Sequence, residues 1–296
     1  MMEGAVSKLK FETVIVIGFG KIAQDVASKL LQYDVTLKLL QTEMQPFSTL
    51  ESFAQKHDVA YQFKHTKEDI ESSLLRWLSG NTLIISANNN YLFKGKLLTL
   101  KNVTIINFHN ALLPNLRGRN APSWAIFHQL EKTGVTWHYV DEGVDTGEAI
   151  AFSDVLVDKH DKAYQVAHKC MHAGLEAFSN VIDELLQTGS TPCLTKQPLR
   201  YDYLYLSKDI PGNGWLDIKQ STLENYRILR ALDYGPFKVF PKALIDNDGD
   251  RYSVRAYQFI DEPSDKSVNS SENSIVINDE FGLLKIHVEK TEIEQG

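Results

Sequence analysis

Short apolar runs alternate with helix-like segments over the first 110 residues, and this alternation constrains the fold more than any other feature. The apolar runs lie at residues 13–17, 35–40, 61–63, 82–86 and 103–108. Strands that alternate with helices pack as a parallel sheet with helices on its faces. The sequence therefore predicts an α/β fold with a Rossmann-like, doubly wound and mostly parallel sheet.

The pattern changes toward the carboxyl end of the chain. A long helix is expected at 162–188, because apolar residues recur there every three or four positions. Short strands are then expected at 242–245, 252–259, 274–277 and 283–288, and the polar stretch 263–274 reads as a mobile loop. We predict a catalytic domain at 1–204 and a small β-rich domain at 205–296.

Composition excludes several classes of protein. The 296 residues are 43% apolar and carry a net charge of −7, which argues against a nucleic-acid surface. Cys170 and Cys193 cannot build a disulfide framework or a cysteine zinc site. His168 and His172 have the spacing of a metal pair but lack its usual acidic partner, so no metal is expected. No run reaches membrane-spanning length, and we expect a soluble, cytoplasmic protein without a membrane partner.

Polar residues gather where the apolar run at 103–106 ends. Asn107 and His109 are two positions apart and point to one side of the strand. Ligands of open α/β sheets bind beyond the carboxyl ends of such strands. A second polar cluster, 141–147, contains Asp145. If the fold brings Asp145 to Asn107 and His109, the three residues form a site for attack on a carbonyl group.

A glycine motif near the amino terminus offers a competing interpretation. Gly18-Phe19-Gly20-Lys21-Ile22-Ala23 follows a strand and matches most of a dinucleotide fingerprint, with Glu43 near the place of a ribose-binding acid. It would indicate a nicotinamide-dependent oxidoreductase. A tight strand-to-helix turn selects small residues as well, so a structural turn close to a substrate phosphate is the other interpretation.

The longer and more specific motifs lie at 107–147. They are Asn107-Phe108-His109, then Leu112-Leu113-Pro114-Asn115-Leu116-Arg117-Gly118, then Asp141-Glu142-Gly143-Val144-Asp145-Thr146-Gly147. Together they resemble the signature of the formyltransferases that use 10-formyltetrahydrofolate. That family includes the methionyl-tRNA, glycinamide ribonucleotide, amino-sugar and peptide-synthetase formyltransferases.

The resemblance implies a role for each residue of the triad. Asn107 would donate its side-chain amide to the formyl oxygen, and His109 would stabilise the oxyanion and exchange protons. Asp145 would hold His109 and relay the proton of the amine. Residue chemistry agrees, because formyl transfer needs an oxyanion donor, a group that titrates near neutral pH and a carboxylate that orients it.

The resemblance also implies the binding residues for the formyl donor, 10-formyltetrahydrofolate. Main-chain groups of two loops would cradle its pterin: Asn88, Asn89, Asn90 and Tyr91 in one loop, and Val140, Asp141 and Gly143 in the other. The run of three asparagines departs from the more apolar stretch of the transfer-RNA enzymes.

The amine acceptor is less defined by the sequence. The scarcity of basic clusters favours a small or carrier-presented amine, foremost a nucleotide-linked amino sugar. An aminoacyl group on a carrier protein and methionyl-tRNA stay as alternatives, and a homodimer stays open. Arg117, Arg119 and Trp124 are the predicted acceptor contacts.

Overall fold

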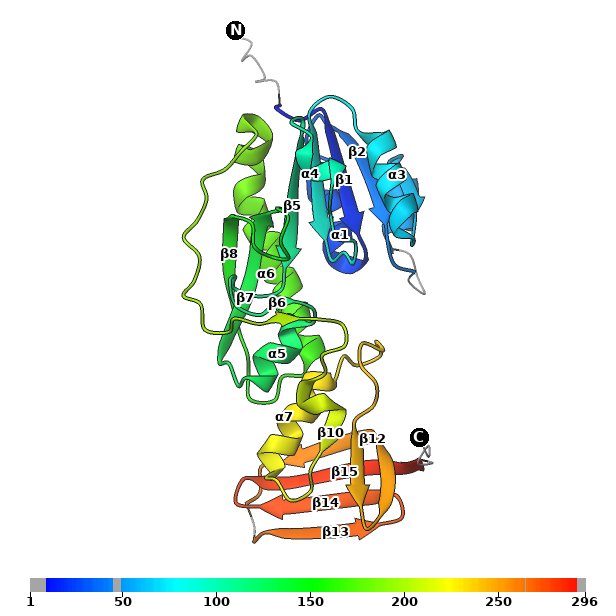
Figure 1. Ribbon diagram of the computed structural model, residues 1–296, viewed down its shortest axis with the longest axis vertical. Coiled ribbons are helices and arrows are strands. Elements are labelled where there is room, and N and C mark those ends of the chain that lie inside the picture. The colour runs from blue at the N-terminus through cyan, green and yellow to red at the C-terminus, as the bar shows by residue number, and fades with distance from the viewer. Residues whose placement is uncertain (1–8, 45–48, 264, 292–296) are drawn as a thin grey trace. The chain divides into compact units, whose positions relative to one another are not determined.

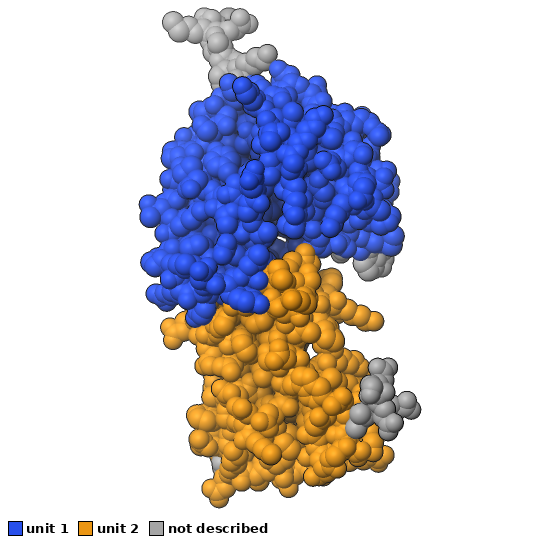
Figure 2. Space-filling view, viewed as in Figure 1, with its two compact units in different colours: residues 1–118, 134–155, 169–204 blue, residues 119–133, 156–168, 205–296 orange. Residues whose placement is uncertain are grey.

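The computed structural model describes residues 9–44, 49–263 and 265–291, and the chain divides into two compact units (Figure 2). Unit 1 comprises residues 1–118, 134–155 and 169–204, and unit 2 comprises residues 119–133, 156–168 and 205–296. The chain enters unit 2 for the last time after Leu204. Two earlier segments also join unit 2, since Ser123 bonds Tyr234 and Lys159 pairs with Asp261.

A seven-stranded sheet with the order β3-β2-β1-β4-β5-β7-β8 forms the centre of unit 1 (Figure 1). Its strands are β1 (Thr13–Gly18), β2 (Thr36–Gln41), β3 (Ala60–Phe63), β4 (Thr82–Ala87), β5 (Val103–His109), β7 (Lys132–Tyr139) and β8 (Ala149–Leu156). The pairs from β3 to β5 are parallel, and β5 pairs with β7 in the antiparallel sense. β1 and β4 are buried along their whole length, as expected for strands covered on both faces. The predicted α/β fold with a mostly parallel sheet is confirmed.

Six helices lie in the described part of the first 190 residues, and the long helix expected at 162–188 is among them. They are α1 (Gly20–Leu30), α2 (Thr49–His57), α3 (Lys67–Trp77), the short α4 (Lys96–Thr99), α5 (Ala121–Phe127) and α6 (Ala163–Thr188). Two short strands, β6 (Arg117–Gly118) and β9 (Leu204–Tyr205), lie in the connections. None of the helices in the described ranges combines the length and the apolar character that a membrane span requires.

The packing of α6 against β5 and β7 determines which way the residues of β5 face. Gly174 of α6 lies against the ring of Phe108, and its carbonyl accepts a hydrogen bond of 2.8 Å from Trp137 Nε1. The ring centroids of Trp137 and Phe178 are 5.1 Å apart. Because side chains alternate along a strand, Phe108 faces α6 while Asn107 and His109 face the opposite side.

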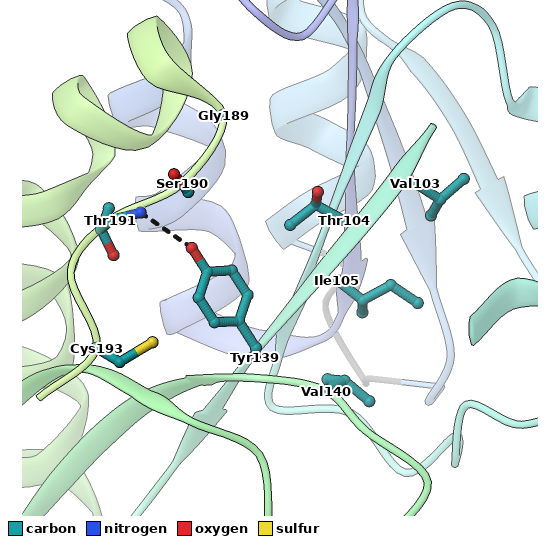
Figure 3. A pocket seen from close by; sticks show the side chains of 9 residues that line it. All are labelled: Val103, Thr104, Ile105, Tyr139, Val140, Gly189, Ser190, Thr191 and Cys193. Atoms are coloured by element: carbon teal, nitrogen blue, oxygen red, sulfur yellow. Dashed lines mark hydrogen bonds between the residues drawn. The ribbon is translucent and has the colours of Figure 1, made fainter. Parts of the chain in front are cut away.

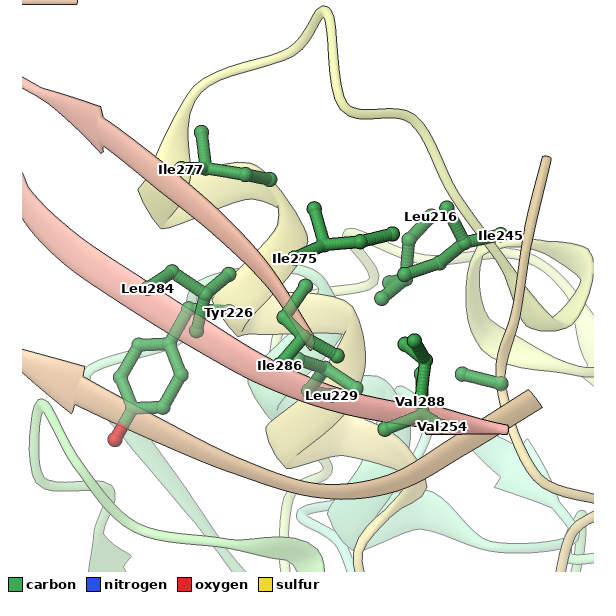
Figure 4. Close-up of a cluster of buried hydrophobic side chains, with 11 residues drawn as sticks. Leu216, Tyr226, Leu229, Ile245, Val254, Ile275, Ile277, Leu284, Ile286 and Val288 are labelled. Carbon is green, nitrogen blue, oxygen red and sulfur yellow. The ribbon is translucent and has the colours of Figure 1, made fainter. Parts of the chain in front are cut away.

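Unit 2 contains a six-stranded sheet with the order β10-β11-β12-β15-β14-β13. Its elements are the 3₁₀ helix η1 (Pro211–Gly214), β10 (Trp215–Leu216), α7 (Thr222–Leu232), β11 (Leu244–Asn247), β12 (Asp250–Ile260), β13 (Ser267–Ser271), β14 (Ser274–Asp279) and β15 (Gly282–Thr291). Ser221 caps α7 by accepting a hydrogen bond of 3.2 Å from the amide of Glu224. Tyr226 and Leu229 of α7 join a buried apolar cluster with side chains of the sheet (Figure 4). The predicted β-rich module is confirmed.

One expectation for unit 2 is wrong. The stretch 263–274 was expected to be a mobile loop, but it contains the edge strand β13, which pairs in antiparallel fashion with β14 from Ser267 to Ser271. Serine and asparagine have low strand propensity, so the sequence gives little sign of this strand. Main-chain pairing with the apolar strand β14 decides the conformation instead.

Because Gly174 contacts Phe108, we predict that Gly174→Ala lowers the unfolding free energy, although replacing glycine by alanine within a helix usually raises it. Helix propensity alone would make Gly174→Ala stabilising by about 1 kcal/mol. An added Cβ would, however, lie 2.2 Å from Phe108 Cε2, and overpacking of a core costs about 1–3 kcal/mol. We expect a net loss of unfolding free energy in urea denaturation, with Glu176→Ala on the exposed side of α6 as control. A more stable Gly174→Ala protein would contradict the packing described here.

Candidate active site

Strand β5 delivers two of the predicted catalytic side chains to its carboxyl end. Asn107 pairs with Ser86 of the parallel strand β4 and with His138 of the antiparallel strand β7. His109, the last residue of β5, is 6% exposed. The loop that follows is held by Thr136, whose Oγ1 donates to Ala111 O and accepts from the amide of Leu113. Asn107 and His109 therefore lie at the carboxyl edge of the sheet, and Thr136 fixes the loop that follows them.

Asp145 approaches the carboxyl end of β5 from the turn at 141–147, which we name the catalytic turn after its predicted role. Its Oδ2 lies 3.4 Å from His109 Nδ1 and accepts a hydrogen bond of 2.8 Å from the amide of Gly118. Asp141 braces the turn by accepting hydrogen bonds from Gly143 N and Thr146 Oγ1 at 3.0 and 2.6 Å. The structure thus places the aspartate and the histidine side by side, 36 positions apart in the sequence, as the predicted triad requires.

His138 is a member of the site that the sequence analysis did not single out. Its Nε2 lies 3.1 Å from Asn107 Nδ2 and 3.5 Å from Asp145 Oδ1. Its Nδ1 lies 2.8 Å from the carbonyl oxygen of Tyr139, which can accept a hydrogen bond when that nitrogen carries a proton. His138 therefore connects Asn107 to Asp145. The available sequence signal was a histidine next to Trp137 within a strand-like run, and the structure buries most of that strand.

Both ring nitrogens of His109 face oxygen acceptors. Nε2 lies 3.0 Å from Leu116 O, and Nδ1 faces the carboxylate of Asp145. A neutral imidazole has one N–H and can satisfy one acceptor, whereas the charged ring satisfies both. Burial lowers the pKa of His109, and the neighbouring carboxylate of Asp145 opposes that effect by favouring the charged form.

Asp145 is ionised despite its burial. Its side chain is 11% exposed, and burial alone would raise its pKa. The imidazole of His109, then His138 and the amide of Gly118, hold the pKa of the carboxyl group well below its usual range. A fixed carboxylate next to a buried imidazole can orient that ring and stabilise it when it gains a proton. An amide, an imidazole and a carboxylate together can support addition to a carbonyl group.

The asparagine side chains of the loop after β4 are hydrogen-bonded to other groups of the protein. Asn89 accepts from the amide of Tyr91 and donates to Tyr91 O, both at 3.0 Å, and Asn90 donates to Glu43. Asn88 donates to Phe19 O at 3.3 Å. The side chains of the three asparagines thus shape the loop, and Asn89 bonds both main-chain groups of Tyr91.

The glycine turn packs directly against this loop. The amide of Phe19 donates to Asn88 O at 3.2 Å, and a Cβ added at Gly18 would lie 1.9 Å from Ala87 O. Gly18 is therefore explained by the close approach of β1 and β4, and the main chain at Phe19 is bonded within the protein. This arrangement favours the structural interpretation of the motif over a dinucleotide site.

A cavity of about 370 Å³ lies beside the first half of β5, at the other end of the strand from His109 (Figure 3). Its walls are Val103, Thr104, Ile105, Tyr139, Val140, Gly189, Ser190, Thr191 and Cys193. The hydroxyl of Tyr139 accepts a hydrogen bond of 3.0 Å from the amide of Thr191. Of the predicted cofactor residues, Val140 contributes to the wall, whereas Asp141 and Gly143 lie in the exposed part of the catalytic turn.

The predicted acceptor contacts fall in both units. Arg117 belongs to unit 1 and pairs with Asp202 at 3.3 Å. Arg119 and Trp124 belong to unit 2. Trp124 is 6% exposed and stacks on Tyr205 with ring centroids 4.1 Å apart, so one face of the indole is covered. Among the described residues, no group of three or more His, Cys, Asp and Glu side chains is arranged to hold a metal ion.

The coupling of Asp145 to His109 gives a prediction that needs no substrate. Asp145→Asn removes the negative charge that favours the imidazolium, so the pKa of His109 should fall further below the ordinary value of about 6.5. Nuclear magnetic resonance titration of labelled histidine measures it. Asp141→Asn keeps the acceptor oxygen of the turn and should leave the pKa of His109 unchanged. A pKa that stays constant or rises in Asp145→Asn would refute the coupling.

Part of this chain is similar in sequence to named proteins of several organisms. It is 29% identical over 172 residues to GDP-perosamine N-formyltransferase of Brucella melitensis, a stretch that covers 58% of this chain and 63% of the relative. It is 29% identical over 162 residues to methionyl-tRNA formyltransferase of Clostridioides difficile, covering 55% and 51%. The chain therefore matches less than two thirds of the length of these relatives.

A solved structure resembles the chain over a longer stretch. The N-formyltransferase of Helicobacter canadensis, in complex with folinic acid and dTDP-3-aminofucose, has a TM-score of 0.70 and 16% identity, covering 95% of this chain and all of the other. At this identity the similarity shows the fold alone. The formyl transferase family model, however, matches residues 12–182, which contain Asn107, His109, His138 and Asp145. The chain belongs to the formyl transferase family.

Proposed function

We propose that the protein transfers the formyl group of 10-formyltetrahydrofolate to the amine of a nucleotide-linked amino sugar. The observation that carries this proposal is the contact of the buried Asp145 carboxylate with His109, on the strand that also presents Asn107. These residues lie within the segment that matches the family model. Each side chain meets one requirement of acyl transfer to an amine.

The proposed chemistry forms one bond and breaks one. The amine nitrogen bonds to the formyl carbon, the bond from that carbon to the donor nitrogen breaks, and the amine proton replaces the formyl group on the donor. Negative charge develops on the formyl oxygen during the addition; the amide of Asn107 donates to this oxygen, and the positive charge of the protonated His109 ring stabilises it. His109 takes up the amine proton, and the carboxylate of Asp145 stabilises the charged ring.

The residues near the site suit a flat, polar-edged pterin ring. Tyr91 and Val140, which belong to the two loops predicted to hold the pterin, are partly buried side chains on one apolar cluster of unit 1. These side chains offer an apolar wall, and the main chain of the asparagine loop offers donors and acceptors. When bound, the folate supplies the activated formyl group. Residues 88–91 and 140–143 would hold it, as the family resemblance implies.

The names of the relatives support an amino-sugar acceptor. The Brucella relative is named for GDP-perosamine, and the Helicobacter structure contains dTDP-3-aminofucose. The net charge of −7 favours a small acceptor over a nucleic acid. Arg117 is the candidate in unit 1 for a contact with a phosphate, because guanidinium groups bind phosphate oxygens in a bidentate manner. An aminoacyl group on a carrier protein and methionyl-tRNA are the alternatives, and a homodimer is a further proposal.

Loss of the His109 side chain should lower turnover strongly without loss of donor binding. In a formyl-transfer assay with amino-sugar nucleotides, His109→Ala should lower kcat by about 10²–10⁴-fold, the usual contribution of a general acid–base group. The exposed His65→Ala is the matched control and should keep full activity. A kcat of His109→Ala equal to that of the wild-type protein would show that His109 has no role in the mechanism.

Ligand binding separates the transferase from the oxidoreductase. Calorimetric titration with stable 5-formyltetrahydrofolate should give a binding isotherm in the wild type and in His109→Ala. Oxidised and reduced nicotinamide cofactors should give none, because the glycine turn is bonded to Asn88. Nicotinamide binding without folate binding would overturn the proposed function.

A further inference from the structure

The segment 190–202, which we name the strap, is extended without forming a helix or strand. Its main-chain amides nevertheless donate hydrogen bonds to other parts of unit 1. The amide of Thr191 donates to Tyr139 Oη at 3.0 Å (Figure 3), and the amide of Leu194 donates to Ala149 O at 2.7 Å. The strap therefore follows the rim of the sheet at β7 and β8.

The strap is bonded to both loops that meet at Asp145. On the loop after β5, Asn115 accepts from the amides of Arg200 and Tyr201 at 2.6 and 3.1 Å. Asn115 also donates to Pro198 O at 2.9 Å. On the catalytic turn, Lys196 Nζ donates to the carbonyl oxygen of Thr146 at 2.5 Å. Thr146 is the residue immediately after Asp145.

The catalytic turn needs such support because of its backbone conformation. Asp145 has a φ of +54°, in the left-handed region that few residues with a side chain adopt. The internal bonds of Asp141 fix the first part of the turn. Gly147 fixes its end, since a Cβ there would lie 1.8 Å from Tyr139 O. The bond from Lys196 holds the peptide between these two anchors.

We propose that Lys196 is a positioning residue of the active site: through the carbonyl of Thr146 it holds Asp145 within reach of His109. This inference rests on the proposed function for its effect on catalysis. The carboxylate of Asp145 faces His109, His138 and the amide of Gly118. The 3.4 Å separation from His109 leaves little room for displacement before the contact is lost.

Three variants test the proposal in the full-length protein. Lys196→Met keeps the length of the side chain but removes the donor, Lys196→Arg keeps a donor, and Lys101→Met removes an exposed lysine next to β5 as control. Displacement of a catalytic group by about 1 Å can cost about 10²-fold in rate. We expect kcat of Lys196→Met to fall by about 10–10²-fold, with the acceptor KM and the Tm nearly unchanged. Lys196→Arg should recover most of kcat, and Lys101→Met should behave as wild type.

A second measurement does not depend on turnover. In Lys196→Met the pKa of His109, followed by histidine resonances, should fall toward its value in Asp145→Asn, because the carboxylate moves away. A wild-type pKa of His109 in Lys196→Met would overturn the positioning role. So would an unchanged kcat, or a loss of kcat that Lys196→Arg does not recover. If the wild-type protein transfers no formyl group, the proposed function is wrong. The positioning role of Lys196 is still tested in that case, because the pKa of His109 reports the position of Asp145 without turnover.

Discussion

The candidate active site depends on one buried carboxylate that contacts several polar groups. Asp145 contacts two imidazoles and the amide of Gly118, although its side chain is 11% exposed. An isolated buried charge would be very costly, so these neighbours are the condition for its ionisation. The same contacts join the catalytic turn to the loop after β5 and to strand β7. A single charge thus has a structural and a chemical role.

Strand β5 provides the second constraint. Its alternate residues face different layers, so the packing of Phe108 against α6 sends Asn107 and His109 to the other side. The register with β7 then places His138 opposite Asn107 and Thr136 opposite His109. Thr136 holds the following loop through its hydroxyl, and that loop supplies Gly118 to Asp145. Core packing and catalytic geometry are therefore linked through adjacent residues of one strand.

The glycine turn shows why a local motif does not establish a function. Its residues suit a dinucleotide site, and the strand order of the sheet reverses between β1 and β4, where sheets of this kind bind their ligands. In this chain the loop after β4 bonds to the turn, and Gly18 allows close contact between the two strand ends. The same small residues thus serve packing, while the polar groups that define the family gather one strand away, at the end of β5.

The sequence by itself determined the α/β fold class and most element positions, and it predicted Asn107, His109 and Asp145 as the triad, because hydrophobic periodicity and short motifs are local properties. It failed at β13, where pairing with β14 overrides the low strand propensity of serine and asparagine. The tertiary structure alone decided that His138 joins Asn107 to Asp145, that the asparagines bond within the chain, and that Lys196 reaches Thr146. These contacts join residues distant in sequence. Their distances follow from strand register and loop packing, which no local pattern encodes.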